Sequence, residues 1–242
     1  MNILITNDDG ISSPILPHLV QFACRFGRVT VVAPKVEQSG KSQALEFRNA
    51  IEIKRVELID GVETWAVDST PADCVRFGVT GLKRSYDLVL SGINRGYNLG
   101  DDIVYSGTIG AIMEGARLGI PGLALSAEHT AFMGAVEHLE SLADYFRTHK
   151  LFTYNSLYNV NIPPRVNGFS ITRQGRTYFS DDFEYRGNDL YLQVGAPLVN
   201  PVTDTGIDID AIHSNLISIT PLTFSRTDLP AFERLQDALK DL

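Results

Sequence analysis

The sequence predicts an α/β protein with a doubly wound, mostly parallel sheet, followed by a β-rich C-terminal extension and a terminal helix. Short apolar runs alternate with stretches of helical apolar spacing through about the first 150 residues. The runs are apolar at successive positions, which is typical of parallel strands covered by helices on both faces. Beyond Leu151, strand-like pieces with polar connections replace this alternation. We therefore predict a single domain over residues 1–242, with a core at 1–150 and an extension at about 151–242.

The elements of the predicted core are separated by residues that end strands and helices. Pro14 suits the first turn of a helix, Gly27 ends that helix, and Pro34 stops the next strand. Asp60-Gly61 has the composition of a tight type I′ turn and marks a hairpin. In chain order we predict a strand at 1–6, a helix at 14–26, a strand at 29–33, a hairpin at 51–67, a helix at 70–77, a strand at 87–91, a helix at 108–118, a strand at 121–126 and a helix at 132–146.

The extension is predicted to contain short strands and a terminal helix. Strands are expected at 158–162, 169–173, 190–194 and 216–219, with no helix before 228–242. That helix has an apolar face formed by Leu229, Phe232, Leu235 and Leu239. The stretch 173–213 is too polar to build a core of its own. We expect it to pack on a partner subunit or to extend as an arm.

Composition narrows the class of protein. Hydrophobic residues make up 44% and charged residues 21% of the chain, as in ordinary globular enzymes. The net charge of −8 argues against a nucleic-acid duplex as partner, because phosphate backbones bind basic surfaces. No apolar run reaches the roughly 18–20 residues of a membrane helix, so we expect no membrane span and no cleavable leader. Cys24 and Cys74 have no CxxC partner. We therefore expect no disulfide and a cytoplasmic protein.

Two adjacent carboxylates follow the first predicted strand directly, in the sequence Asn7-Asp8-Asp9-Gly10. A carboxylate pair beside the core is costly unless a metal ion, a basic residue or a shared proton compensates it. The next basic residue along the chain is His18. This favours a hard divalent cation such as Mg²⁺ or Mn²⁺. The alternative is an Asx turn at the strand end, with the second aspartate capping a helix.

Ligands of doubly wound sheets bind beyond the carboxyl ends of the strands. The strand at 29–33 leads into a polar loop that contains Ser39, and the strand at 87–91 leads into a glycine-rich loop that contains Asn94. Three successive strand ends therefore bring oxygen-bearing side chains to one edge of the sheet. This convergence favours the metal-site interpretation over a simple turn.

A further candidate site lies where Ser106-Gly107-Thr108 opens the helix at 108–118. Free N–H groups and the helix dipole make such a terminus suitable for an anion, and plain Ser/Thr capping is the alternative. The sequence has no GxGxxG after a strand, no P-loop, no GxSxG and no HExxH. A dinucleotide cofactor, P-loop chemistry and zinc catalysis are therefore disfavoured.

An ordered set of motifs runs along nearly the whole chain. These are Ile3-Leu4-Ile5-Thr6-Asn7-Asp8-Asp9-Gly10, Val32-Ala33-Pro34 with Ser39-Gly40, Thr70-Pro71-Ala72-Asp73-Cys74, Ser91-Gly92-Ile93-Asn94-Arg95-Gly96, Ser106-Gly107-Thr108-Ile109-Gly110-Ala111, Asn159-Val160-Asn161-Ile162-Pro163 and Ser218-Ile219-Thr220-Pro221-Leu222. Together they resemble the SurE family, the survival-protein nucleotidases. The chain departs from the family's usual pattern at Lys35, at Ser69 and at Glu184-Tyr185-Arg186-Gly187.

The resemblance implies a Rossmann-like core whose C-terminal arm is exchanged between subunits of a homodimer or homotetramer. It also implies metal-dependent hydrolysis of nucleoside monophosphates, with one divalent metal ion, Mg²⁺ or Mn²⁺, per subunit. The implied metal ligands are Asp8, Asp9, Ser39 and Asn94. The implied phosphate contacts are Asn98, Ser106, Gly107 and Thr108.

These observations predict a phosphoric monoester hydrolase of the 5′-nucleotidase type, with 3′-nucleotidase and exopolyphosphatase activity as further expectations. Asp8 or Asp9 would orient or deprotonate the attacking water. An aspartyl-phosphate intermediate is disfavoured because adjacent metal-bound carboxylates are poor nucleophiles. The competing hypothesis is a non-catalytic protein that senses a nucleotide or a metal on the same fold. Hydrolysis of phosphodiesters or polyphosphate at the same site is a third hypothesis.

Overall fold

The computed structural model describes residues 1–176, 180–198 and 201–240, and its centre is a nine-stranded sheet. Across the sheet the strands are β3 (Ile53–Val56), β4 (Glu63–Val67), β2 (Arg28–Pro34), β1 (Asn2–Thr6), β5 (Leu88–Arg95), β6 (Gly122–Ala127), β7 (Leu157–Ile162), β11 (Leu216–Pro221) and β8 (Gly168–Ile171). The strands from β4 to β7 are parallel to their neighbours, whereas β3 and β11 run antiparallel to β4 and β7. The predicted α/β class with a mostly parallel sheet is confirmed.

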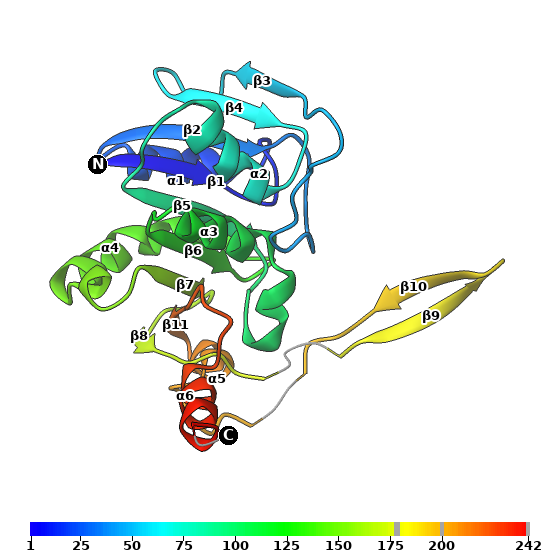
Figure 1. Cartoon of the computed structure of the whole chain (residues 1–242). Helices are drawn as coiled ribbons and strands as arrows, with labels where there is room; N and C mark the ends of the chain where they lie inside the picture. The colour runs from blue at the N-terminus through cyan, green and yellow to red at the C-terminus, as the bar shows by residue number, and fades with distance from the viewer. Residues whose placement is uncertain (177–179, 199–200, 241–242) are drawn as a thin grey trace.

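Helices cover both faces of this sheet, and Figure 1 shows two of them in front of it and α1 behind. On one face α1 (Leu16–Ala23) and α4 (Leu139–Thr148) pack into a common buried cluster. On the other face α2 (Pro71–Arg76) and α3 (Gly107–Arg117) pack into a second cluster. Successive side chains of β1 alternate between the two clusters, because neighbouring residues of a strand point to opposite faces. Continuous apolar strands are therefore buried on both sides.

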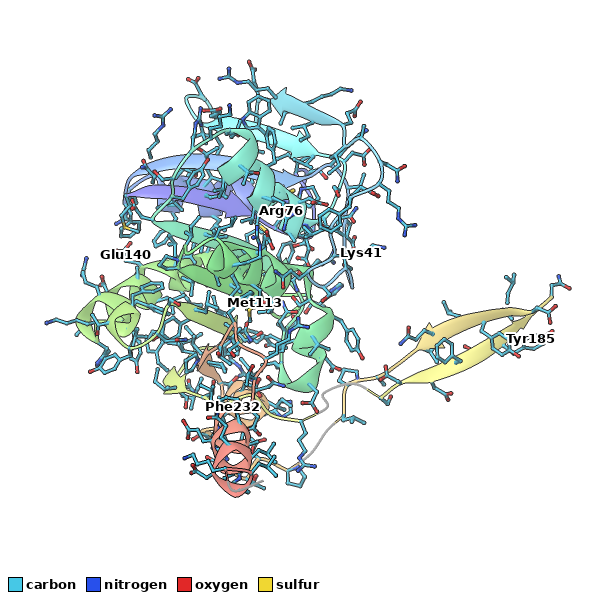
Figure 2. All side chains as sticks on the ribbon, in the orientation of Figure 1. Lys41, Arg76, Met113, Glu140, Tyr185 and Phe232 are labelled. Carbon is cyan, nitrogen blue, oxygen red and sulfur yellow. The ribbon has the colours of Figure 1, made fainter. Side chains whose placement is uncertain are left out.

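Beyond the sheet, β9 (Asp182–Gly187) and β10 (Leu190–Val194) form an antiparallel hairpin that projects from the body of the molecule (Figure 1). Its large side chains are exposed, including Tyr185, which Figure 2 shows near the far end. This arrangement agrees with the expectation of an arm for the hairpin, but residues 208–212 of the same predicted stretch are buried against the body of the chain. The apolar face of α6 (Leu229–Ala238), which includes Phe232, is exposed as well. Exchange of the arm between subunits stays a prediction.

Three helical expectations need correction. The predicted helix at 132–146 begins as the 3₁₀ helix η3 (Phe132–His138), which has no side-chain cap, and becomes α-helical only in α4. The expectation of no helix before 228 is wrong, because α5 (Asp208–His213) lies in the extension. A helix of six residues is too short to show helical periodicity. The terminal helix ends at Ala238, and the last two positions of its predicted span lie outside the described residues.

The predicted hairpin at 51–67 forms, but its turn is wider than expected. Residues 57–62 join β3 to β4, and of the Asp60-Gly61 pair only Gly61 has a positive φ, of 75°. A type I′ turn needs a positive φ at both central positions. Strand β9 was not predicted, because its charged residues hide the apolar alternation of a strand. Among the described residues, no helix combines the length and the hydropathy needed to cross a bilayer.

Candidate functional site

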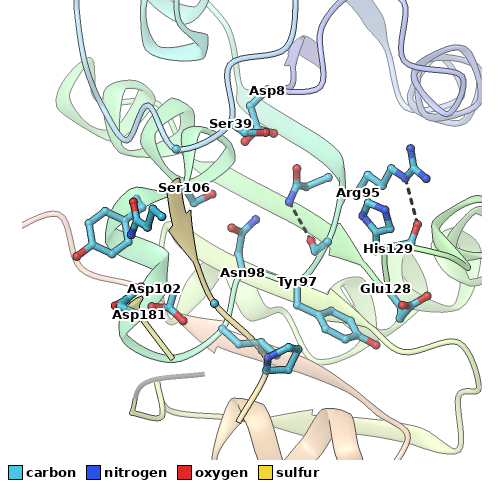
Figure 3. A pocket seen from close by; sticks show the side chains of 18 of the residues that line it. Asp8, Ser39, Arg95, Tyr97, Asn98, Asp102, Ser106, Glu128, His129 and Asp181 are labelled. Atoms are coloured by element: carbon cyan, nitrogen blue, oxygen red, sulfur yellow. Dashed lines mark hydrogen bonds between the residues drawn. The ribbon is translucent and has the colours of Figure 1, made fainter. Parts of the chain in front are cut away.

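A pocket of about 890 Å³ opens beyond the carboxyl ends of the central strands (Figure 3). It is lined by residues that follow β1, β2, β5 and β6, by the 3₁₀ helix η2 (Gly100–Tyr105) and by the base of the β9–β10 hairpin. The pocket lining includes five of the predicted site residues, namely Asp8, Ser39, Asn94, Asn98 and Ser106. The three others, Asp9, Gly107 and Thr108, are chain neighbours of this set.

Asp8, at the end of β1, is only 4% exposed, and its Oδ1 accepts a hydrogen bond from Thr108 Oγ1 at 2.5 Å. Burial raises the pKa of Asp8, and hydrogen bonds from Thr108 oppose this rise. Asp9 is less buried, and its Oδ2 accepts a hydrogen bond from the Arg95 N–H at 3.2 Å. Burial and the charge of Asp8 raise the pKa of Asp9 to about 6. Ionisation of both carboxyls is therefore unfavourable unless a cation lies beside them.

Asn94 reaches the pocket through an irregularity in β5. The pairing of β5 with β6 changes register between Ser91 and Asn94. Gly92 lies in this shift with a φ of 126°, and a Cβ at this position would be 2.2 Å from the carbonyl oxygen of Leu125. Asn94 Nδ2 donates to the Gly96 carbonyl at 2.9 Å. Oδ1 is the atom of Asn94 that can bind a cation, because the amide nitrogen is a donor and only the oxygen offers lone pairs.

Ser39 lies in the loop that follows β2, and Figure 3 shows it next to Asp8. The N–H of Gln38 donates to the carbonyl of Asp8 at 2.7 Å and so ties this loop to the end of β1. The exposed hydroxyl of Ser39 donates to Glu37 at 2.7 Å. Its oxygen lone pairs are the part of the side chain that suits a cation.

The predicted ligand set fits a hard divalent cation by its chemistry. Two carboxylates, one hydroxyl and one amide oxygen make an all-oxygen set, which suits Mg²⁺ or Mn²⁺ and lacks the thiolate and imidazole groups that softer metals prefer. Within residues 1–176, 180–198 and 201–240, no three His, Cys, Asp or Glu side chains gather in a group that could hold a metal. The set therefore depends on neutral oxygens to complement its two carboxylates.

The start of α3 packs directly against Asp8. Ser106 caps this helix, and its Oγ accepts a hydrogen bond from the N–H of Ile109 at 3.1 Å. A Cβ on Gly107 would lie 3.0 Å from the Cβ of Asp8. The capping alternative is thus confirmed for Ser106, and the Thr108 hydroxyl is directed at the carboxylate. Contact of these residues with a phosphate stays a prediction.

Asn98 is held in place by a hydroxyl on β6 and two side-chain amides on β7. Its N–H donates to Asn161 Oδ1 at 2.9 Å, and its Nδ2 donates to Ser126 Oγ at 2.7 Å. Its carbonyl oxygen accepts hydrogen bonds from Asn159 Nδ2 and Asn161 Nδ2, each at 2.9 Å. Such a network fixes the backbone of the loop after β5. Asn98 therefore stands at a defined position in the pocket wall.

Several lining residues were not predicted. Glu128 and His129 follow β6, so the rule applied to the first three strand ends would have identified them. Glu128 accepts hydrogen bonds from the Thr130 hydroxyl at 2.7 Å and the Ala131 N–H at 2.8 Å, so it also stabilises the turn after β6. Asp181 comes from the base of the hairpin, and no local pattern indicates its place in the pocket.

Comparison with known proteins shows the family of the chain. The family model described as survival protein SurE matches residues 3–181. A protein of Thermosipho melanesiensis named 5′-nucleotidase SurE is 34% identical, over 100% of this chain and 98% of its own length. One of the same name from Paramagnetospirillum magneticum is 39% identical, over 96% and 95%. The crystal structure of the SurE protein from Aquifex aeolicus superposes with a TM-score of 0.82 at 31% identity, covering 98% of this chain and 99% of that one. The chain therefore belongs to the SurE family.

Proposed function

We propose that the protein is a metal-dependent 5′-nucleotidase that hydrolyses nucleoside monophosphates by attack of water. The observation that carries this proposal is the carboxylate of Asp8, which is buried against the start of a helix, lines a pocket large enough for a nucleotide and is followed directly by the carboxylate of Asp9. The name 5′-nucleotidase SurE that the relatives carry supports the same activity.

Each residue of the site has a role in this proposal. Asp8, Asp9, Ser39 and Asn94 would hold the cation, which when bound would polarise the phosphoryl oxygens and lower the pKa of a water. Asp8 or Asp9 would also orient or deprotonate the attacking water.

Donors beside the carboxylates would hold the phosphate. The amides at the start of α3 would offset the charge that develops in the transition state. Asn98 Nδ2 uses one hydrogen on Ser126 and has a second for a phosphate oxygen. The residues of the chain would therefore bind the cation and the phosphate, orient the attacking water and offset the charge of the transition state.

Phosphate release from a panel of 5′- and 3′-nucleoside monophosphates tests the activity. We expect multiple turnover with Mn²⁺ or Mg²⁺ and none after chelation, with activity restored when the metal is added back. Thermal melting with and without the metal reports metal binding independently of activity, because a specific ligand stabilises the folded state. A protein that binds metal and nucleotide without releasing phosphate from any member of the panel would instead be a sensor.

We expect inorganic polyphosphate to be the poorest substrate of this enzyme. Among the described residues that line the pocket, Glu128 and Asp181 carry carboxylates, and Arg95 is the one lysine or arginine. A long polyanion is repelled by such a lining, whereas a nucleoside is neutral beyond its phosphate. The specificity constant for tripolyphosphate should be at least about tenfold below that of the best nucleotide. The difference should shrink at high salt, which screens exposed charges, and equal constants at low salt would contradict the expectation.

We also propose that the protein forms a homodimer or homotetramer. The exposed apolar side chains of the β9–β10 hairpin and of α6 support this proposal, because adjacent exposed apolar residues are costly in water and typical of interaction surfaces.

A further inference from the structure

The loop that carries Ser39 is tied to the body of the protein on both sides of this residue. On one side lies the bond from Gln38 to the carbonyl of Asp8. On the other side the N–H of Ser42 donates to the Tyr105 carbonyl at 2.9 Å, and its hydroxyl donates to the Val104 carbonyl at 2.7 Å. The position of Ser39 relative to Asp8 therefore depends on how firmly both ties hold.

Next to Ser42, Gln43 makes a contact of a different kind. Its Nε2 donates at 3.0 Å to Glu114, whose side chain is only 1% exposed. Glu114 also accepts hydrogen bonds from Arg76 Nε at 3.0 Å and from Arg117 at 2.7 Å. Burial opposes ionisation of this carboxyl, but the hydrogen bonds from Arg117, Gln43 and Arg76 outweigh it and lower the pKa of Glu114. Gln43 is thus bonded to a buried carboxylate whose charge is compensated.

The loop also lies in close contact with α3, the helix to which Glu114 belongs. A Cβ on Gly110 would be 2.1 Å from the carbonyl oxygen of Ser42, so the backbone of the loop passes directly over this glycine. The same helix begins at Ser106-Gly107-Thr108, against Asp8. Farther along the loop, the Arg76 guanidinium lies over the ring of Phe47, 5.5 Å from its centroid. One helix therefore carries the anchor of the loop and one wall of the candidate metal site.

We infer that Gln43 is a positioning residue whose hydrogen bond to Glu114 fixes the loop so that Ser39 stands ready to bind the cation beside Asp8. This inference rests on the proposed function. The hydroxyl bond of Ser42 is exposed, so water competes for it, whereas the bond of Gln43 reaches a shielded and charged acceptor. Loss of the Gln43 bond should loosen the loop without exposing an uncompensated charge, because Glu114 keeps both arginines.

The variant Gln43→Met tests the inference, because methionine keeps the length of the side chain and lacks the donor. In the metal-free protein we expect faster amide hydrogen exchange at 39–46. We expect the Kd for Mn²⁺, measured by calorimetry without substrate, to rise about tenfold. The melting temperature of the metal-free variant should stay within a few degrees of wild type.

Two further variants make the result decisive. Glu63→Gln is the control, because it weakens a different ion pair, between Glu63 on β4 and Arg84 at 2.6 Å. It should leave both the hydrogen exchange at 39–46 and the Kd for Mn²⁺ unchanged. Ser39→Ala should weaken Mn²⁺ binding at least as much as Gln43→Met does.

The possible outcomes separate the two proposals. If Ser39→Ala binds Mn²⁺ like wild type, Ser39 is not a ligand, and the proposed ligand set and the role of Gln43 are both wrong. If Ser39→Ala weakens binding and Gln43→Met does not, the positioning role alone is overturned, whether or not exchange in the loop becomes faster.

Discussion

Asp8→Asn should reduce kcat by roughly a thousandfold or more, while the metal-free variant stays at least as stable as wild type. Asp8 lines the pocket, is buried, and is held by Thr108 Oγ1 at 2.5 Å. Asparagine keeps the shape and one acceptor oxygen for Thr108 but removes the charge that would hold the cation. Loss of several kcal/mol of charge stabilisation in the transition state corresponds to about a thousandfold in rate.

Asp8→Asn should lower activity without lowering stability, because the two neighbouring carboxyls repel each other when both are ionised. Burial and this repulsion already raise the pKa of Asp9 to about 6. Removal of the Asp8 charge relieves the repulsion at neutral pH, so the melting temperature of the metal-free variant should be equal to or above that of wild type. Added Mn²⁺ should raise the melting temperature of wild type and leave that of the variant almost unchanged.

Asp87→Asn is the matched control, since Asp87 accepts a hydrogen bond from Asn2 at the opposite end of the sheet, at 2.7 Å. It removes the same charge and should retain wild-type turnover and metal response. Turnover in Asp8→Asn near the wild-type rate, with Mn²⁺ still stabilising the protein, would show that Asp8 is not a ligand and that the metal site lies elsewhere.

The assembly of the candidate site was predictable where it depends on parallel strand order. Asp8 and Ser39 follow β1 and β2, and the carboxyl ends of parallel strands share one edge of the sheet. Asn94 was expected in a loop after a strand at 87–91, but β5 continues to Arg95 and Asn94 lies near its end. The same rule on strand ends predicts that Glu128, which follows β6, lines the pocket. A continuous apolar run is visible in a sequence, and burial on both faces follows from it. These residues could therefore be placed in one pocket without the structure.

Features that depend on long-range packing could not be predicted in this way. The contact between Thr108 and Asp8 joins residues a hundred positions apart. Asp181 lines the pocket only because the base of the projecting hairpin returns to η2. The helix α5 is held by Asp208, which accepts hydrogen bonds from the N–H groups of Gly100 and Gly175 at 2.9 Å and 2.8 Å. In each case the short local sequence fits several conformations, and the tertiary contact selects one.

The register shift at Gly92 also depends on long-range packing. A substitution of this glycine gives the second large expected effect. Gly92→Ala should destabilise the protein by roughly 3–4 kcal/mol and weaken metal binding in whatever fraction remains folded. The φ of 126° at this position is strained for any side chain, and the added Cβ would lie 2.2 Å from the Leu125 carbonyl oxygen. That oxygen belongs to the backbone of β6, so relief of the contact must move a central strand or shift Asn94 out of the pocket.

Gly119→Ala separates the two causes of this effect, because Gly119 has a φ of 78° and nothing within 4 Å of an added Cβ. Gly119→Ala should lower the free energy of unfolding only by the cost of a positive φ at a residue with a side chain, about 1–2 kcal/mol. It should leave the Kd for Mn²⁺ unchanged. The difference in the free energy of unfolding between the two variants, measured by urea denaturation, then reports the clash with Leu125. If Gly92→Ala is no less stable than Gly119→Ala and binds Mn²⁺ normally, β5 and β6 tolerate a side chain at the shift. The placement of Asn94 would then not depend on this glycine.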